Sequence, residues 1–237
     1  NIALALAQNG KSVLLVDGDL RKPAVAKLLG INASEDGGVY GVINGEKTLA
    51  EAIKYSEKYN LFLLVSGKPV FDPSEILSTD AMSDIIKSAE KEFDYIIIDC
   101  PPSLGLITLN AFTAANSVLI PVQCEYYALE GLGQLINTIN LVKKHLNKNI
   151  EIEGALLTMY DARTNLSNQV VKEVKKYFDN KVYKTVIPRN VRLSEAPSYG
   201  MPITEYDARS KGAKSYEKFT KEFLKINEVE RKAKHML

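Results

Sequence analysis

Residues 93–102, Phe-Asp-Tyr-Ile-Ile-Ile-Asp-Cys-Pro-Pro, restrict the fold of this chain more than any other stretch. Three consecutive isoleucines between an aromatic residue and a carboxylate predict a buried β-strand that ends at Asp99. The two prolines end the strand, because proline cannot donate to the ladder of a sheet. Ligands of open parallel sheets bind outside the carboxyl ends of the strands. Asp99 is therefore a candidate Mg²⁺ ligand; the alternative is an aspartate that only caps the following turn.

The composition fits an ordinary soluble globular protein. The chain has 237 residues, enough for a sizeable α/β core, with 46% hydrophobic and 25% charged residues. Because the net charge is only +1, contact with nucleic acid would have to come from a local basic patch. Cys100 and Cys124 lack the spacing of metal ligands, so we expect reduced core thiols. The sequence contains no apolar run of the ~20 residues that span a bilayer.

Strand-like and helix-like segments alternate along the chain, which predicts an α/β, doubly wound and mostly parallel sheet with helices on both faces. We expect a single domain over residues 1–237, with a charged and frayed tail over 225–237. Apart from the strand ending at Asp99, the expected strands are 12–16, 61–65, 117–122, 152–158 and 182–187. The expected helices are 2–8, 23–29, 39–43, 49–55, 73–90, 106–115, 129–146, 168–178 and 210–224.

Asp17 and Asp19 leave the end of another predicted strand, two residues apart. In an extended segment they would point to opposite sides, so that one braces the site while the other faces a substrate. Near a metal-bound triphosphate, one acid would serve the outer shell of the metal and the other would orient the attacking water. The alternative is an Asp-Gly turn without chemistry, which a second acidic strand end at Asp99 makes a weaker explanation.

Four long strings resemble the ParA, Soj and MinD group of deviant Walker A ATPases, and Soj-type chromosome partitioning ATPases in particular. They lie at 94–106, 120–132, 157–166 and 186–197, within a resemblance that runs from about Asp94 to Phe223. The resemblance implies a P-loop NTPase-like fold, ATP and Mg²⁺ as cofactors, and hydrolysis of ATP to ADP and phosphate. It also implies a nucleotide-dependent homodimer, non-specific DNA binding, a ParB-type partner and a cytoplasmic, nucleoid-associated location.

The first half of the chain resembles a sister group, the bacterial tyrosine kinases of capsule and exopolysaccharide synthesis. The strings that carry this resemblance are 19–23, 41–46, 48–53 and 71–77. The alternative function is therefore a tyrosine-kinase-like ATPase domain, although residues 225–237 lack the tyrosines of that group's tail. A MinD-like membrane-surface protein is a third alternative. Residues 228–237 have mixed charge and few apolar side chains, so we expect no stable membrane association.

Both groups begin with a strand and a glycine-rich phosphate loop that contains two lysines, and neither feature occurs in this sequence. The segment Ile2–Ala7 resembles the end of the helix that follows this loop. We therefore expect an N-terminally truncated domain. The backbone N–H groups and lysine of the loop would hold the phosphates. Without them, and without a central strand, we expect the 237 residues to bind ATP poorly and to fold badly.

The resemblance also implies roles for individual residues. Asp19 would position the water that attacks the γ-phosphate, Asp17 would support the magnesium shell, and Asp99 would hold magnesium through water. Pro188 and Asn190 match the adenine-contacting segment, although a turn after a strand would explain a Pro-x-Asn sequence equally well. Residues 103–109 would form a switch segment that senses the γ-phosphate and reaches the dimer interface.

Arg163 and Arg192 match positions at which Soj-like proteins carry DNA-binding arginines. Arg189, Lys211 and Lys214 would extend the same patch. Sequence-independent binding needs only phosphate contacts from Arg and Lys, and it weakens steeply with salt. For each of these residues the alternative is a solvated surface charge.

Overall fold

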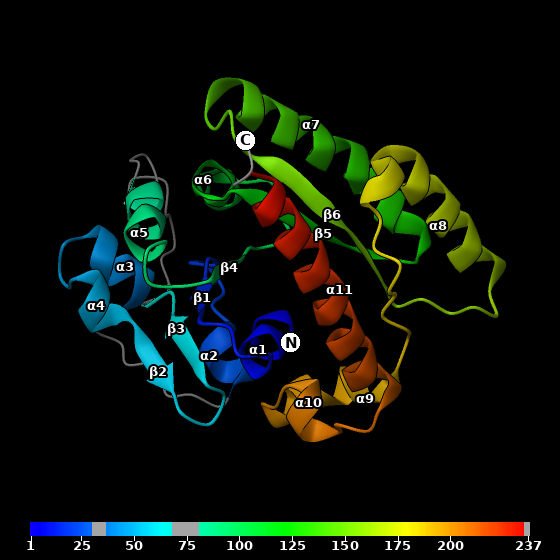
Figure 1. Cartoon of the computed structure of the whole chain (residues 1–237), viewed down its shortest axis with the longest axis horizontal. Coiled ribbons are helices and arrows are strands. Elements are labelled where there is room, and N and C mark those ends of the chain that lie inside the picture. The colour runs from blue at the N-terminus through cyan, green and yellow to red at the C-terminus, as the bar shows by residue number, and fades with distance from the viewer. Residues whose placement is uncertain (30–36, 68–80, 235–237) are drawn as a thin grey trace. The chain divides into compact units, whose positions relative to one another are not determined.

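The computed structural model describes residues 1–29, 37–67 and 81–234. These residues form two compact units (Figure 1). Unit 1 contains Asn1–Ala5, Leu119–Gly133 and Ile152–Leu237, and unit 2 contains Leu6–Val118 and Gln134–Glu151. The expectation of one domain over 1–237 stays a prediction.

Unit 2 is built on a four-stranded sheet in the order β2-β3-β1-β4. Strand β1 (Val13–Asp17) pairs in parallel with β3 (Leu61–Leu64) and with β4 (Tyr95–Asp99). The short β2 (Lys54–Ser56) pairs antiparallel with β3. The predicted class, a mostly parallel sheet with helices, is confirmed.

One face of this sheet packs against an apolar cluster in unit 2. Alternate residues of a strand point to the same face, so Leu14 and Val16 of β1 lie in one apolar layer with Leu64 of β3. Helices α3 (Gly38–Ile43), α4 (Leu49–Ala52), α5 (Ala81–Ala89) and α6 (Leu106–Ala114) contribute buried side chains to the same cluster. These contributions are Val39, Ala52, Met82, Ile85, Ile86, Ala89 and Ile107. The short α2 (Val25–Leu28) follows the acidic end of β1.

Strands β5 (Ser117–Gln123) and β6 (Glu151–Thr158) form a separate pair. They run in parallel, because Glu151 N donates to Asn116 O at one end and Cys124 N donates to Thr158 O at the other. Helix α7 (Glu130–His145) connects them. Helix α1 (Ile2–Gln8) opens the chain, as predicted.

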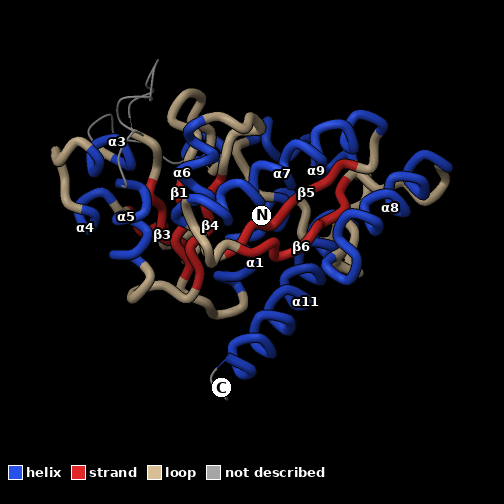
Figure 2. The backbone as a smooth tube through the Cα atoms, turned by 90° about the horizontal axis from the view of Figure 1, so that it is seen from above, coloured by secondary structure: helices blue, strands red, loops and turns tan. Residues whose placement is uncertain are grey.

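The rest of unit 1 is helical. It contains α8 (Asn165–Phe178), α9 (Val191–Glu195), α10 (Ile203–Tyr206) and α11 (Lys211–Lys234). Figure 2 shows α11 as one long helix leading to the C-terminus. Its buried Phe219 packs edge-on against Tyr183, with ring centroids 4.8 Å apart.

Several predicted boundaries are wrong. The helix expected over 49–55 ends at Ala52, and Tyr55 belongs to β2. Residues 182–187 form no strand, and Val182 makes the one isolated bridge of this segment, to Ala155. The last helix continues past its expected end at residue 224 to Lys234.

The isoleucines of β4 are only partly buried, because β4 is the edge strand of its sheet. The string 71–77 lies outside the described residues.

Candidate functional site

The carboxyl ends of β1 and β4 bring three aspartates to one edge of the sheet in unit 2. Asp17 and Asp99 are register partners in the parallel β1–β4 pair, and Asp19 follows two residues after Asp17. We call Asp17, Asp19 and Asp99 the acidic edge. The sequence placed all three at strand ends, and the structure brings them together.

Asp17 is buried, with 1% of its surface exposed. Its Oδ1 accepts a hydrogen bond from Asp19 N at 3.2 Å, and its Oδ2 accepts from Ala24 N and Val25 N at 3.1 Å each. The carboxylate therefore fixes the turn after β1 and the start of α2. Burial raises the pKa of Asp17 to about 6, against the lowering effect of these backbone hydrogen bonds.

Asp19 is more accessible than Asp17. Its Oδ1 accepts from Arg21 N at 3.1 Å and from Lys22 N at 3.0 Å, which holds the side chain in a fixed direction. Within the part of the chain that the structure describes, its Oδ2 has no hydrogen-bond partner. Asp17 thus braces the turn after β1, as the Asp-Gly-Asp spacing suggested for one of the two acids. That Asp19 faces a substrate stays a prediction.

Asp99 stands at the tip of β4, where the residue as a whole is exposed. The protein atoms around its carboxyl group nevertheless remove part of the water that would solvate the charge. This burial raises the pKa of Asp99, and the charge of Asp19 raises it further. The neighbouring thiol of Cys100 has a pKa of about 12, raised by burial and by the charges of Asp99 and Asp19. Asp19 and Asp99 therefore act on the same small region.

The acidic edge fits a hydrated cation better than a directly caged one. In the described ranges, no group of three or more His, Cys, Asp and Glu residues could hold a metal ion. Mg²⁺ retains several of its waters and needs only one or two carboxylates together with phosphate oxygens. That Asp99 holds such an ion through its waters stays a prediction.

A second polar edge lies in unit 1, where β5, β6 and the segment before α9 end. Met159 adopts a φ of 51°, a left-handed conformation that bulky residues rarely take. This turn brings Tyr160 beside Pro188 in a parallel bridge, and Arg189 N donates to Tyr160 O at 2.9 Å. Asn190 forms the N-cap of α9, where its Oδ1 accepts from Leu193 N at 3.4 Å. Asn190 thus has a structural role, as the turn explanation predicted.

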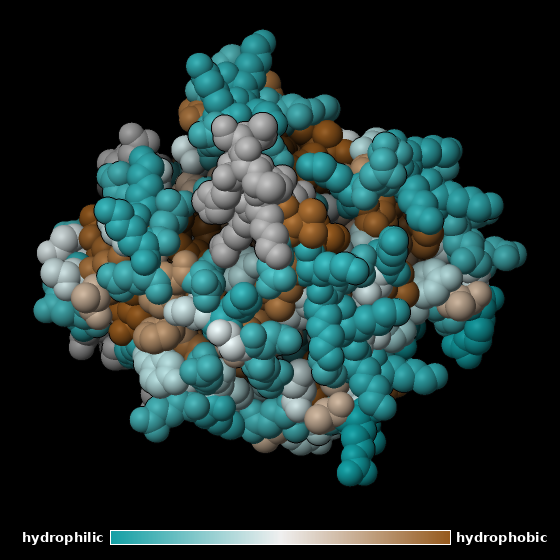
Figure 3. All heavy atoms as spheres, viewed as in Figure 1, coloured by the Kyte–Doolittle hydropathy of each residue, from teal (hydrophilic) through white to brown (hydrophobic). Residues whose placement is uncertain are grey.

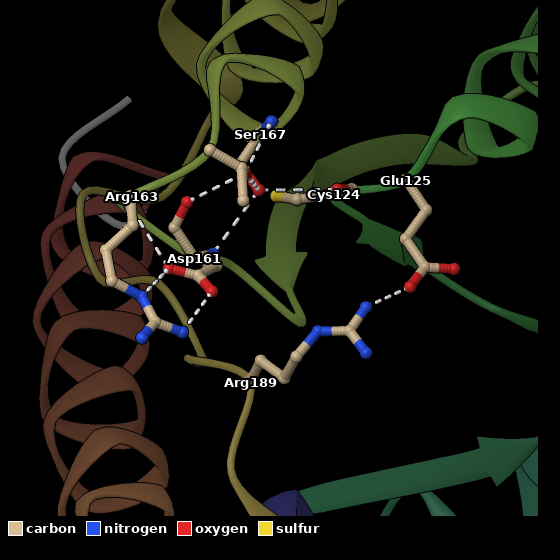
Figure 4. A network of polar contacts seen from close by, with 7 residues as sticks. Cys124, Glu125, Asp161, Arg163, Ser167 and Arg189 are labelled. Atoms are coloured by element: carbon tan, nitrogen blue, oxygen red, sulfur yellow. Dashed lines mark hydrogen bonds and ion pairs between the residues drawn. The ribbon is translucent and has the colours of Figure 1, made fainter.

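The same edge holds a network of charged residues, drawn in Figure 4. Arg189 reaches across to Glu125, which follows β5, and the two side chains form an ion pair. Asp161 faces Arg163 and receives two hydrogen bonds from its guanidinium. Buried Ser167 of α8 lies within hydrogen-bond distance of Asp161 N and Cys124 O.

Arg192 also has acidic partners in unit 1. Its Nη1 lies 2.9 Å from Glu195 Oε2, and its Nε lies 3.6 Å from Asp207 Oδ2. Sequence reasoning selected Arg163, Arg189 and Arg192 but missed these partner carboxylates. The i,i+3 spacing of Arg192 and Glu195 could have indicated one pair, whereas Glu125 lies 64 residues from Arg189 and gave no sequence signal.

The surface drawn in Figure 3 is mostly hydrophilic, with hydrophobic residues in separate patches. The charged residues expected to bind DNA, including Lys211 and Lys214, are all exposed. Among the helices that the structure describes, none is both long and apolar enough to cross a membrane.

A mostly parallel sheet with helices gives the chain a fold of the P-loop NTPase-like class. A family profile described as an AAA domain matches residues 1–152. The sporulation initiation inhibitor protein Soj of Bacillus subtilis is 51% identical over 227 residues, covering 94% of this chain and 90% of the relative. The chromosome partitioning protein ParA of Myxococcus xanthus is 44% identical over 234 residues, covering 95% and 81%.

Solved structures with a similar fold come from the same broad group of nucleotide-bound proteins. The septum site-determining protein MinD of Pyrococcus horikoshii, complexed with Mg-ADP, has a TM-score of 0.79 at 25% identity and covers 96% of this chain and 89% of its own. Cobyrinic acid a,c-diamide synthase of Mycobacterium smegmatis, with bound ADP and magnesium, has a TM-score of 0.78 at 31% identity and covers 93% and 84%. The chain belongs to the ParA/Soj/MinD-type family of P-loop ATPases. The tyrosine-kinase resemblance of the first half stays a prediction.

Proposed function

We propose that this chain is a chromosome or plasmid partitioning ATPase, which binds ATP with Mg²⁺ and hydrolyses it to ADP and phosphate. The observation that carries this proposal is the acidic edge, where Asp19 and Asp99 act on one region beside the buried brace Asp17. The Soj and ParA relatives support the biological role, since their identity extends over nearly the whole chain.

The three aspartates take separate parts in the proposed reaction. Magnesium, when bound, would neutralise phosphate charge, and Asp99 would hold it by accepting hydrogen bonds from its waters. Asp19 would use Oδ2 to accept a hydrogen bond from the attacking water and aim it at the γ-phosphate. Asp17 would keep Asp19 in position through the hydrogen bond from Asp19 N. Residues 103–109, which follow β4, would sense the γ-phosphate and reach the dimer interface.

Pro188 and Asn190 would contact the adenine base. The Oδ1 of Asn190 already caps α9, so its amide nitrogen is the atom available as a donor to a base acceptor. An Asn190→Asp variant would keep the cap and lose this donor. We expect its affinity for ATP to fall by about ten-fold with little change in stability, whereas equal losses in ATP and inorganic triphosphate affinity would contradict the assignment.

The 237 residues contain no glycine-rich loop with paired lysines. We therefore propose that they bind ATP weakly by themselves, because backbone N–H groups and a lysine supply most phosphate contacts in such sites. The test is isothermal titration of Mg-ATP into this chain and into a fusion that carries the strand and phosphate loop of B. subtilis Soj ahead of Asn1. Weak binding by the chain and micromolar binding by the fusion support the proposal; micromolar binding by both contradicts it.

The proposed partners are non-specific DNA, a second copy of the chain in the ATP-bound state and a ParB-type protein that stimulates hydrolysis, in the cytoplasm and on the nucleoid. Unit 1 supplies the exposed DNA residues Arg163 and Arg192, with Arg189, Lys211 and Lys214 nearby in sequence or fold. Phosphate contacts from such residues are independent of base sequence. Charge reversal at both Arg163 and Arg192 should abolish binding to random-sequence DNA at physiological salt, and unchanged affinity would exclude these residues.

A further inference from the structure

The guanidinium of Arg163 is held by a carboxylate two residues away. Asp161 Oδ1 accepts from Arg163 Nε at 2.9 Å and from Arg163 N at 3.0 Å, and Asp161 Oδ2 accepts from Nη2 at 2.8 Å. The Arg163 side chain is 88% exposed, whereas that of Asp161 is 18% exposed. The arginine therefore lies on the surface while its partner is recessed in the loop below it.

This carboxylate is fixed by the fold of the loop. Asp161 N donates to the buried Ser167 Oγ at 3.3 Å, and Asp161 O accepts from Thr164 N at 3.1 Å. Thr164 is the N-cap of α8, so the loop is anchored to the helix that follows it. The hydrogen bonds from Arg163 lower the pKa of Asp161 to about 2, and the acid is ionised at neutral pH.

Arg192 is held in a similar way. Glu195 binds its Nη1, and the same carboxylate oxygen accepts from Tyr206 OH at 3.0 Å. Both arginines that match DNA-binding positions thus carry carboxylates on guanidinium nitrogens that a phosphate would contact. Asp161 occupies Nε and Nη2 of Arg163, whereas Arg192 has Glu195 on Nη1 and Asp207 3.6 Å from Nε.

We propose that Asp161 and Glu195 compete with DNA phosphate for Arg163 and Arg192, and thereby set the DNA affinity of this chain. The inference rests on the proposed DNA binding. A phosphate presents paired oxygens like those of a carboxylate, so the same face of the guanidinium cannot serve both. Exposed ion pairs are weak, which allows phosphate to displace them, but each carboxylate also repels the phosphate it competes with.

Asp161→Asn and Glu195→Gln test this competition, because both retain an oxygen acceptor of the same size and lose the charge. In the fusion that carries the Soj phosphate loop, with ATP and Mg²⁺ present, we expect each to tighten binding to random-sequence duplex DNA by about five-fold at 50 mM salt. The slope of the logarithm of the DNA-binding constant against the logarithm of salt concentration should become steeper by about 0.9 for each arginine that is freed from its carboxylate. Glu173→Gln is the matched control: Glu173 pairs with Lys176 at 2.6 Å on α8 in the same unit, and its loss changes the net charge equally.

The outcomes separate this inference from the proposed function. If the fusion that carries the Soj phosphate loop does not bind DNA at 50 mM salt with ATP and Mg²⁺ present, or if its Arg163→Ala and Arg192→Ala variants bind as well as the unmutated fusion, the proposed DNA function fails and the inference fails with it. If the alanine variants lose affinity while Asp161→Asn and Glu195→Gln match Glu173→Gln, only the competition is wrong. Weaker binding by the two neutralised variants would contradict the competition, because it would mean that the carboxylates position the arginines for DNA. Thermal unfolding of each variant confirms that a folded protein is compared.

Discussion

The backbone of Gly18 lies directly against the backbone of Asp99. Gly18 N donates to Asp99 O at 2.8 Å, and a Cβ atom on residue 18 would lie 2.7 Å from the same oxygen. The turn between Asp17 and Asp19 can therefore approach β4 only because residue 18 has no side chain. This contact sets the separation of the acids in the acidic edge.

Gly18→Ala should accordingly disturb the acidic edge. The added methyl group meets backbone that cannot rotate away, and we expect a loss of about 2 kcal/mol in the free energy of unfolding. Urea unfolding measures this loss. Gly131→Ala in α7 is the control, because its Cβ would meet nothing within 4 Å, and alanine should stabilise that helix by up to about 1 kcal/mol. Equal stabilities of the two variants would contradict the close approach.

Asp17 and Asp19 should respond differently to alanine. Asp17→Ala leaves three backbone N–H groups without their acceptor, and we expect it to cost about 3 kcal/mol of stability. Asp19→Ala removes only an accessible turn contact and should cost less than about 1 kcal/mol. Chemical denaturation at pH 7 tests this contrast. A larger loss of stability in Asp19→Ala than in Asp17→Ala would contradict the assignment of Asp17 as the residue that braces the turn.

The raised pKa of Asp17 makes stability depend on pH. Between its ordinary value of 3.8 and about 6, the folded state keeps the proton that the unfolded state has released. Stability must therefore fall as pH rises through this window, by up to about 3 kcal/mol. Asp17→Asn should lose this part of the slope but keep the part due to Asp99, whose pKa is also raised. Urea unfolding in EDTA between pH 4 and 7 measures the stability of both proteins at each pH. Parallel profiles of stability against pH for the wild type and Asp17→Asn would contradict the prediction.

Asn147 closes the end of α6 in unit 2. Its amide nitrogen lies 3.1, 3.0 and 2.8 Å from the carbonyl oxygens of Phe112, Thr113 and Ala115. Asn147→Ala should reduce stability by about 2 kcal/mol, because the last carbonyls of the helix lose their donor. Asn149→Ala, an exposed neighbour, should stay within about 0.5 kcal/mol of wild type. Thermal unfolding measures both variants, and equal losses of stability would contradict the role of Asn147 at the end of α6.

The sequence predicted the acidic edge well because local signals place it. Apolar runs that end in aspartate identify strand tips, and parallel strands bring such tips to one edge. The charged network of unit 1 depends on the fold, since Glu125 and Arg189 meet only after β5 and the segment before α9 are side by side. The residues of the Val182–Ile187 segment predicted a strand, yet the segment makes one isolated bridge to β6, between Val182 and Ala155. Burial of β4 depends on its place in the sheet, which its own isoleucines do not encode.

ATP turnover by an Asp19→Ala variant addresses the catalytic role of the acidic edge. The comparison uses the fusion with the Soj phosphate loop, so that ATP binding and hydrolysis are measured separately. Our account predicts that Asp19→Ala binds Mg-ATP within about two-fold of the unmutated fusion and hydrolyses it at least about 100-fold more slowly. Hydrolysis at the unmutated rate by a variant with unchanged ATP affinity would contradict the assignment of Asp19 as the residue that orients the attacking water.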